Sequence, residues 1–216
     1  MMRIDIFSDT VCPWCYLGKR RLHLAVLSRP QYEFSLTWRP FELNPEMPLE
    51  GMDRTAYLSL RGLNTPRFIE SQNELQRLGA ASGIDYRFDL IKRVPNSRFS
   101  HLLIAHAARF GLAAEVKERI MKGYFEEGRD IGDVEQLAQL AKDVGLSADR
   151  ARHALVLRIG QDGVVASERH AHVLGITGVP TFVFDGQYTL AGAQEVGVFA
   201  QILDQVAEMA SAKGAS

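Results

Sequence analysis

Cysteine is scarce in this sequence. Its 216 residues include only two, Cys12 and Cys15, which stand three positions apart with Pro13 and Trp14 between them. A zinc site needs four ligands, and neither a second cysteine pair nor a suitably spaced histidine completes one, so we expect no metal. A chain of this length buries a sizeable core without crosslinks. The pair is therefore either a redox couple or two inert core residues.

An excess of charge of one sign and long apolar runs are also missing. The formal net charge is −1 and the sequence pI is about 6.6, so the sequence indicates no nucleic-acid or anionic-membrane partner. No stretch approaches the 18 apolar residues of a membrane span. The first ten residues lack the basic and apolar regions of a secretory signal. We therefore predict a cytoplasmic protein, in a compartment that keeps thiols reduced.

The N-terminal part of the chain carries a strand, a helix and a second strand. Ile4 and Ile6 alternate in a short strand, a helix is predicted from about Cys12 to Leu27, and residues 32–43 alternate again. This order is typical of a parallel βαβ unit. One buried stripe of the helix is predicted from its leucine spacing: Leu17, Leu24 and Leu27.

The middle of the chain has few strand signals. We predict four to six helices between residues 45 and 167, several of them ending at glycines: Gly83, Gly111 and Gly145. Asp133 is a suitable N-cap for one of these helices. This stretch holds no internal repeat and no low-complexity linker.

Strand signals return near the C-terminus. Residues 181–184 and 188–191 are apolar runs joined through Asp185-Gly186, which predicts a β-hairpin, and an amphipathic helix follows. Neither end of the chain can bury a sheet alone. We therefore predict an α/β fold with one discontinuous domain from residues 1–44 and 168–216, and an insertion of helices at 45–167.

The cysteine pair lies at the predicted turn from strand to helix. There the Cys12 sulfur would face free backbone N–H groups and the positive end of the helix dipole, both of which favour the thiolate. Cys15 would lie one turn on, and Pro13 suits the first helical turn. Cys12 could then attack a disulfide and Cys15 could resolve the mixed disulfide. Trp14 either supplies apolar surface or tunes the couple toward a less oxidising pair.

A second signal lies far along the chain, where Val179-Pro180 directly precedes a predicted strand. One interpretation is an ordinary turn proline. The other is a cis-proline that faces the thiols, with the backbone of Val179 binding an extended substrate. The residues around this proline leave both interpretations open.

Taken together, these motifs resemble the DsbA family of the thioredoxin superfamily, and its FrnE-like branch in particular. That branch is related to the 2-hydroxychromene-2-carboxylate isomerases and the kappa-class glutathione transferases. The stretches that carry the resemblance span nearly the whole chain: SDTVCPWCYLGKRRL (8–22), PFELNP (40–45), NSRFSHLLIAHAA (96–108), GVPTF (178–182) and AGAQ (191–194).

The resemblance implies a thioredoxin fold interrupted by an all-helical insertion. It also implies Cys12 as nucleophile, Cys15 as resolving thiol and Pro180 as the cis-proline. The related isomerases and transferases carry serine in place of Cys12 and use glutathione as cofactor. This chain departs from them there, which favours dithiol chemistry. The departure does not exclude glutathione as a reductant or cosubstrate. No tightly bound cofactor is expected.

Five further residues are candidates for the site. Asp9 would cap the helix or assist proton transfer at Cys15. Asn96 is most simply a helix N-cap and His101 a packed surface residue, but both could line a substrate cleft under the inserted helices. Asn44 lies in a stretch that resembles a loop near the active site in the DsbA family. Gln194 would approach the site or cap the last helix.

Three functional hypotheses follow. The first is a thiol–disulfide oxidoreductase acting on protein disulfides or small thiols. The second is a glutathione-dependent isomerase or transferase of an aromatic or polyketide-like molecule, which predicts a deep apolar cleft between insertion and sheet. The third is a redox-inert binding module. Either a monomer or a homodimer is compatible with the sequence.

Overall fold

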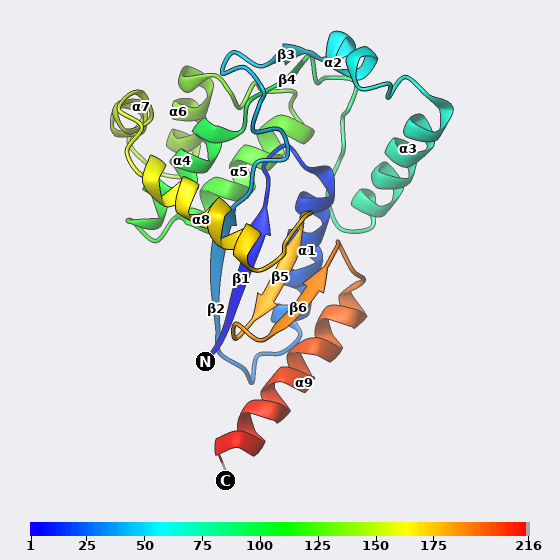
Figure 1. The fold of residues 1–216 in the computed structure, drawn as a ribbon, viewed down its shortest axis with the longest axis vertical. Coiled ribbons are helices and arrows are strands. Elements are labelled where there is room, and N and C mark those ends of the chain that lie inside the picture. Colours follow the sequence, from blue (N-terminus) through cyan, green and yellow to red (C-terminus); the bar gives the residue numbers. More distant parts are fainter. Residues whose placement is uncertain (215–216) are drawn as a thin grey trace.

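A four-stranded sheet lies at the centre of the computed structural model, which describes residues 1–214 (Figure 1). Its strand order is β2-β1-β5-β6, from β1 (Met2–Ser8), β2 (Phe34–Pro40), β5 (Thr181–Phe184) and β6 (Tyr188–Ala191). β2 runs parallel to β1, whereas β5 is antiparallel to β1 and β6 to β5. The prediction of one sheet built from both ends of the chain is confirmed.

The C-terminal hairpin forms at the predicted position. Asp185 and Gly186 adopt positive φ angles of 49° and 71°, as a tight turn requires. The Asp185 side chain also accepts a hydrogen bond from the Arg3 N–H at 2.7 Å. The turn residues and this hydrogen bond to β1 therefore favour the same register of β5 against its neighbours.

Helices α1 (Pro13–Leu27) and α9 (Val196–Gly214) pack against each other beside the sheet. The predicted leucine stripe of α1 is wrong in part, because Leu17 is buried but Leu24 and Leu27 are 43% and 63% exposed. Leu17 packs into the core of the insertion. Leu24 lies about 10 Å further along the helix. The insertion packs against the first turns of α1, and the later turns bury Leu22 and Ala25 against the sheet and α9 instead.

Seven helices separate the two halves of the sheet: α2 (Arg54–Leu60), α3 (Pro66–Ala80), α4 (Arg98–Ala108), α5 (Ala113–Phe125), α6 (Val134–Asp143), α7 (Ala148–Val156) and α8 (Gln161–Val173). Helices α4 to α7 form a compact block and α8 packs beside β2 (Figure 1). The predicted boundary after residue 167 falls inside α8. The division at 44 and 167 stays a prediction, and residues 215–216 of its last segment lie outside the described chain.

Several helix ends lie where the sequence predicts them. The Asp133 side chain accepts a hydrogen bond from the Gln136 N–H at 2.8 Å, which confirms it as the cap of α6. Gly111 and Gly145 take the positive φ angles of helix stops. A short ribbon of β3 (Met52–Asp53) and β4 (Arg93–Val94) was not predicted, because two residues per strand show no alternation. Among the described residues, no helix is long and apolar enough to cross a membrane.

Candidate active site

The two thiols lie where β1 passes into α1. Cys12 is the N-cap residue of α1 and Cys15 lies in its first turn, with the Cys15 N–H donating to the Cys12 carbonyl at 3.0 Å. Both are free thiols with 4% and 1% exposure. Burial, together with the neighbouring Cys12, raises the pKa of Cys15 well above its usual value. Cys15 is therefore a neutral thiol at rest.

The loop before β5 lies directly against Cys12. The Cys12 Sγ is 3.8 Å from the Val179 carbonyl oxygen, and the Val179–Pro180 peptide bond is cis. Pro180 is buried behind it. The structure thus brings together two segments that are 167 residues apart in the sequence.

Gly18 on α1 makes this close approach feasible, and the sequence analysis missed it. A Cβ at this position would lie 3.1 Å from Pro180 Cγ and 3.2 Å from Phe182 Cζ, closer than ordinary packing allows. A glycine inside a predicted helix is unfavourable by about 1 kcal/mol relative to alanine, which is the signal that could have revealed it.

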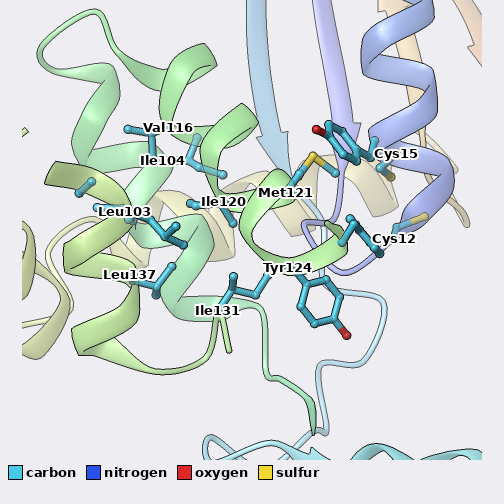
Figure 2. Close-up of a cluster of buried hydrophobic side chains, with 14 of the residues drawn as sticks. Cys12, Cys15, Leu103, Ile104, Val116, Ile120, Met121, Tyr124, Ile131 and Leu137 are labelled. Carbon is cyan, nitrogen blue, oxygen red and sulfur yellow. The ribbon is translucent and has the colours of Figure 1, made fainter. Parts of the chain in front are cut away.

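Insertion helix α5 covers the thiols from the opposite side. Met121 and Tyr124 of α5 reach toward the turn that carries Cys12 and Cys15, and all four belong to one apolar cluster (Figure 2). Tyr86, also unpredicted, donates its hydroxyl to the Pro13 carbonyl at 2.5 Å. The insertion therefore both excludes water from the thiols and anchors their turn.

Asp9 is a buried carboxylate beside this turn. Its Oδ1 lies 3.2 Å from His101 Nε2, and its Oδ2 accepts the Leu43 N–H at 2.7 Å. Burial alone would raise the pKa of Asp9, but the interaction with His101 and the bond from Leu43 outweigh it and hold the pKa below its usual value. The predicted capping of α1 is wrong, because Cys12 is the N-cap residue and Asp9 accepts no bond from a backbone N–H of α1. The other interpretation, proton transfer between Asp9 and Cys15, stays a prediction.

The remaining predicted residues lie around the site in structural roles. His101 is not on the surface but 2% exposed against Asp9, and it lines a cavity under the inserted helices, as the alternative prediction had it. Asn96 is not the N-cap of α4, which is Ser97, but it accepts the Arg98 N–H at 2.9 Å and donates to the Met47 carbonyl at 2.7 Å. Asn44 accepts the Tyr57 hydroxyl at 3.2 Å.

Gln194 and Trp14 complete the predicted set. Gln194 donates its side-chain amide to the Ala191 carbonyl at 2.8 Å, close to the point where the Gly192 N–H meets the Pro180 carbonyl, also at 2.8 Å. Trp14 is 37% exposed at the start of α1. It is the aromatic side chain of the motif that faces solvent.

Lys117 of α5 is the functional candidate that the sequence analysis overlooked. It is 1% exposed, and burial lowers its pKa to about 8, an effect partly offset by attraction to Cys15 and Asp9. Its position between Ala113 and Met121 follows the apolar stripe of the helix, four residues from each. A lysine on an apolar stripe was the available signal.

The sequence model of the DSBA-like thioredoxin domain matches residues 3–204. The chain belongs to this family. A probable DsbA oxidoreductase from Streptomyces coelicolor is 33% identical with a TM-score of 0.86, over 95% of this chain and 90% of that one. The predicted thioredoxin fold with a helical insertion and the DsbA resemblance are confirmed.

Two more distant structures share the DsbA-like fold. The cytosolic disulfide reductase DsbM from Pseudomonas aeruginosa is 21% identical with a TM-score of 0.67, over 99% of this chain and 100% of that one. A 2-hydroxychromene-2-carboxylate isomerase is 17% identical with a TM-score of 0.70, over 97% and 98%. The fold thus hosts both classes of chemistry raised by the sequence, and the residues at the site must decide between them.

Proposed function

We propose that this DsbA-like protein is a thiol–disulfide oxidoreductase that works through the Cys12–Cys15 couple. The observation that carries the proposal is the placement of two free thiols at a helix N-terminus, with the Cys12 sulfur 3.8 Å from the Val179 carbonyl beside a cis-proline. A redox-inert module would need neither feature.

The reaction proceeds in two exchanges. The Cys12 thiolate attacks one sulfur of a substrate disulfide, and the other sulfur leaves as a thiol after taking up a proton. Cys15 then loses its proton and attacks the Cys12 sulfur. The Cys12–Cys15 disulfide forms and the second substrate thiol leaves. Two electrons pass from the dithiol to the substrate, and the reverse sequence oxidises a dithiol substrate.

The protein assists the second exchange electrostatically. Cys15 has a raised pKa, so its deprotonation is the difficult step. The Lys117 ammonium attracts the charge that develops on Cys15, and it is protonated near neutral pH because its pKa is about 8. Asp9 keeps the turn in place through His101 and Leu43 rather than by accepting this proton.

Substrate binding is assigned to the surface around the turn. The backbone of Val179 offers hydrogen-bonding groups to an extended peptide or a glutathione-like thiol, as in strand addition. Trp14 supplies an exposed apolar contact beside the nucleophile. DsbM, whose structure has also been solved with glutathione, makes this small thiol a reasonable reductant to test. We further propose a cytoplasmic location and no tightly bound cofactor.

Single replacements of the thiols test this function. Cys12→Ser should abolish disulfide reduction, and Cys15→Ser should accumulate mixed disulfides that a nonreducing gel and mass spectrometry detect. Trapping should occur at Cys12 alone. Full activity of Cys12→Ser would overturn the proposal.

A glutathione-dependent isomerase or transferase is the second candidate. One observation favours it: a cavity of about 550 Å³ opens between the inserted helices and the edge of the sheet. Neither thiol is among the residues that line this cavity, which weakens the link to the reaction. This alternative predicts saturable glutathione binding and activity that survives Cys15→Ser.

A further inference from the structure

The cavity lies against the outer edge of the sheet, away from the Val179 loop. Strand β2 forms one wall through residues 36–40, and helices α4, α5 and α8 form the others. Its volume of about 550 Å³ is within the usual range of small-molecule sites. Much of its lining is alkyl or aromatic, from Leu36, Trp38, Ile104, Ala108, Ala114 and Val164.

Lys117 brings a buried positive charge to this apolar cavity. Its ammonium has three N–H donors. Within residues 1–214, no hydrogen bond or ion pair joins it to an acceptor, and its Nζ lies 5.1 Å from the centroid of the Trp38 ring. An ammonium that opens onto a largely apolar cavity without a carboxylate partner is costly. An anion from outside the chain would remove that cost.

Three other polar side chains of the cavity already have partners. Arg39 pairs with Asp5 at 2.9 Å, and the Ser167 hydroxyl donates to the Pro40 carbonyl at 3.2 Å. His101 is held by Asp9. Asp9 attracts Lys117 through space, but its oxygens are occupied by His101 and by backbone N–H groups. Among the described residues that line the cavity, Lys117 is thus the buried cation that makes no ion pair.

We propose that this cavity binds an apolar monocarboxylate. The carboxylate meets the Lys117 ammonium, and the apolar body lies along Trp38 and the alanine-rich faces of α4 and α5. One charge at the inner end and an alkyl or aromatic body elsewhere match the distribution of charge in the lining. The site shares Lys117 with the proposed resolving step but does not include Val179, and its binding of a carboxylate is tested without the redox reaction.

A pair of probes of matched shape tests the charge. We would titrate the protein with 4-phenylbutyrate and with the neutral 4-phenylbutan-1-ol, and follow backbone amide shifts by NMR. We expect saturable binding, shifts concentrated in residues 36–40 and 104–117, and at least tenfold tighter binding of the acid. Equal affinities, shifts elsewhere, or no saturation by the acid at millimolar concentration would overturn the proposal.

Three variants locate the interaction. Lys117→Met should reduce the affinity for the acid to that for the alcohol. Lys122→Met removes an exposed lysine from the same helix and should change neither. Ala114→Trp fills the cavity from its rim and should abolish binding of both probes. Unchanged binding in Lys117→Met or Ala114→Trp would contradict the proposal. So would a dimer, seen by gel filtration, that Ala114→Trp dissociates, since a second copy would then cover the cavity.

Discussion

The thiol turn and the helical insertion both bury a charge near Cys15, but they treat it differently. On the turn, the Asp9 carboxylate is bonded to His101 and to the Leu43 backbone, so its pKa is lowered and it stays ionised. On the insertion, the Lys117 ammonium faces Trp38 without an acceptor, and its pKa falls to about 8. A satisfied charge holds structure together. An unsatisfied charge costs stability and remains available for chemistry or for a ligand.

The largest expected effect comes from removing the satisfied charge. Asp9→Ala leaves His101 and the Leu43 N–H without a partner in the interior, and should lower the free energy of unfolding by about 3–5 kcal/mol. Urea denaturation measures this. Asp133→Ala, which removes only an exposed helix cap, should cost about 1 kcal/mol. Equal losses in the two variants would show that the Asp9 contacts are not structural.

The unsatisfied charge should behave in the opposite way. A lysine pKa of about 8 in the folded state, against about 10.4 unfolded, costs about 3 kcal/mol at pH 7. Lys117→Met should therefore raise the free energy of unfolding by about that amount. The free-energy cost of the buried Lys117 charge is complete below pH 8 and disappears as pH rises toward 10.4. The stability that Lys117→Met gains over the original protein should therefore shrink between these values. Urea denaturation at pH 7 and pH 9 tests this, with Lys122→Met as the variant that should show no gain.

Lys117→Met should also slow the resolving step. Without the ammonium, the thiolate of Cys15 loses its attracting charge and the pKa of Cys15 rises further. Lifetimes of the Cys12 mixed disulfide, measured by quenched-flow, should lengthen about tenfold. A more stable variant with an unchanged lifetime would separate Lys117 from the reaction.

A smaller effect is expected where α1 meets the cis-proline loop. Gly18→Ala adds a Cβ 3.1 Å from Pro180 Cγ, and overpacking of this kind costs about 1–3 kcal/mol. A Cβ at Gly163 in α8 would have no neighbour within 4 Å, so Gly163→Ala should instead stabilise the folded protein by up to about 1 kcal/mol. Thermal denaturation of both variants gives the contrast. A stabilised Gly18→Ala would contradict the packing of this loop.

The sequence predicted the parts of the molecule that depend on neighbouring residues. The Asp185-Gly186 hairpin, the cap at Asp133 and the helix that starts after Cys12 each follow from chemistry within a few positions. The pairing of Asp9 with His101 spans 92 positions, so no local pattern shows it. For the same reason Asp9 was assigned to the nearest helix and His101 to the surface.

Burial along the helices was harder to predict. Leu24 of α1 has the spacing of a buried residue, but the sheet and α9 cover Leu22 and Ala25 there and leave Leu24 exposed. Lys117 has the identity of a surface residue, yet α5 turns it into the cavity beside β2. Both errors arise because the helical pattern of a sequence shows which residues share a face. It does not show which part of that face a neighbouring element covers.

The central claim is that Cys12 and Cys15 interconvert between dithiol and disulfide, and their equilibrium in glutathione buffers tests it most directly. Trp14 stands between the two cysteines in the sequence, so its fluorescence should follow the formation of the disulfide. Cys12→Ser, which cannot form this disulfide, is the control that should show no change. The account predicts a reversible intramolecular disulfide with a potential between about −270 and −120 mV, the range of thioredoxin-fold couples. Failure to form this disulfide anywhere in that range would contradict dithiol chemistry and leave glutathione-dependent chemistry or a redox-inert protein.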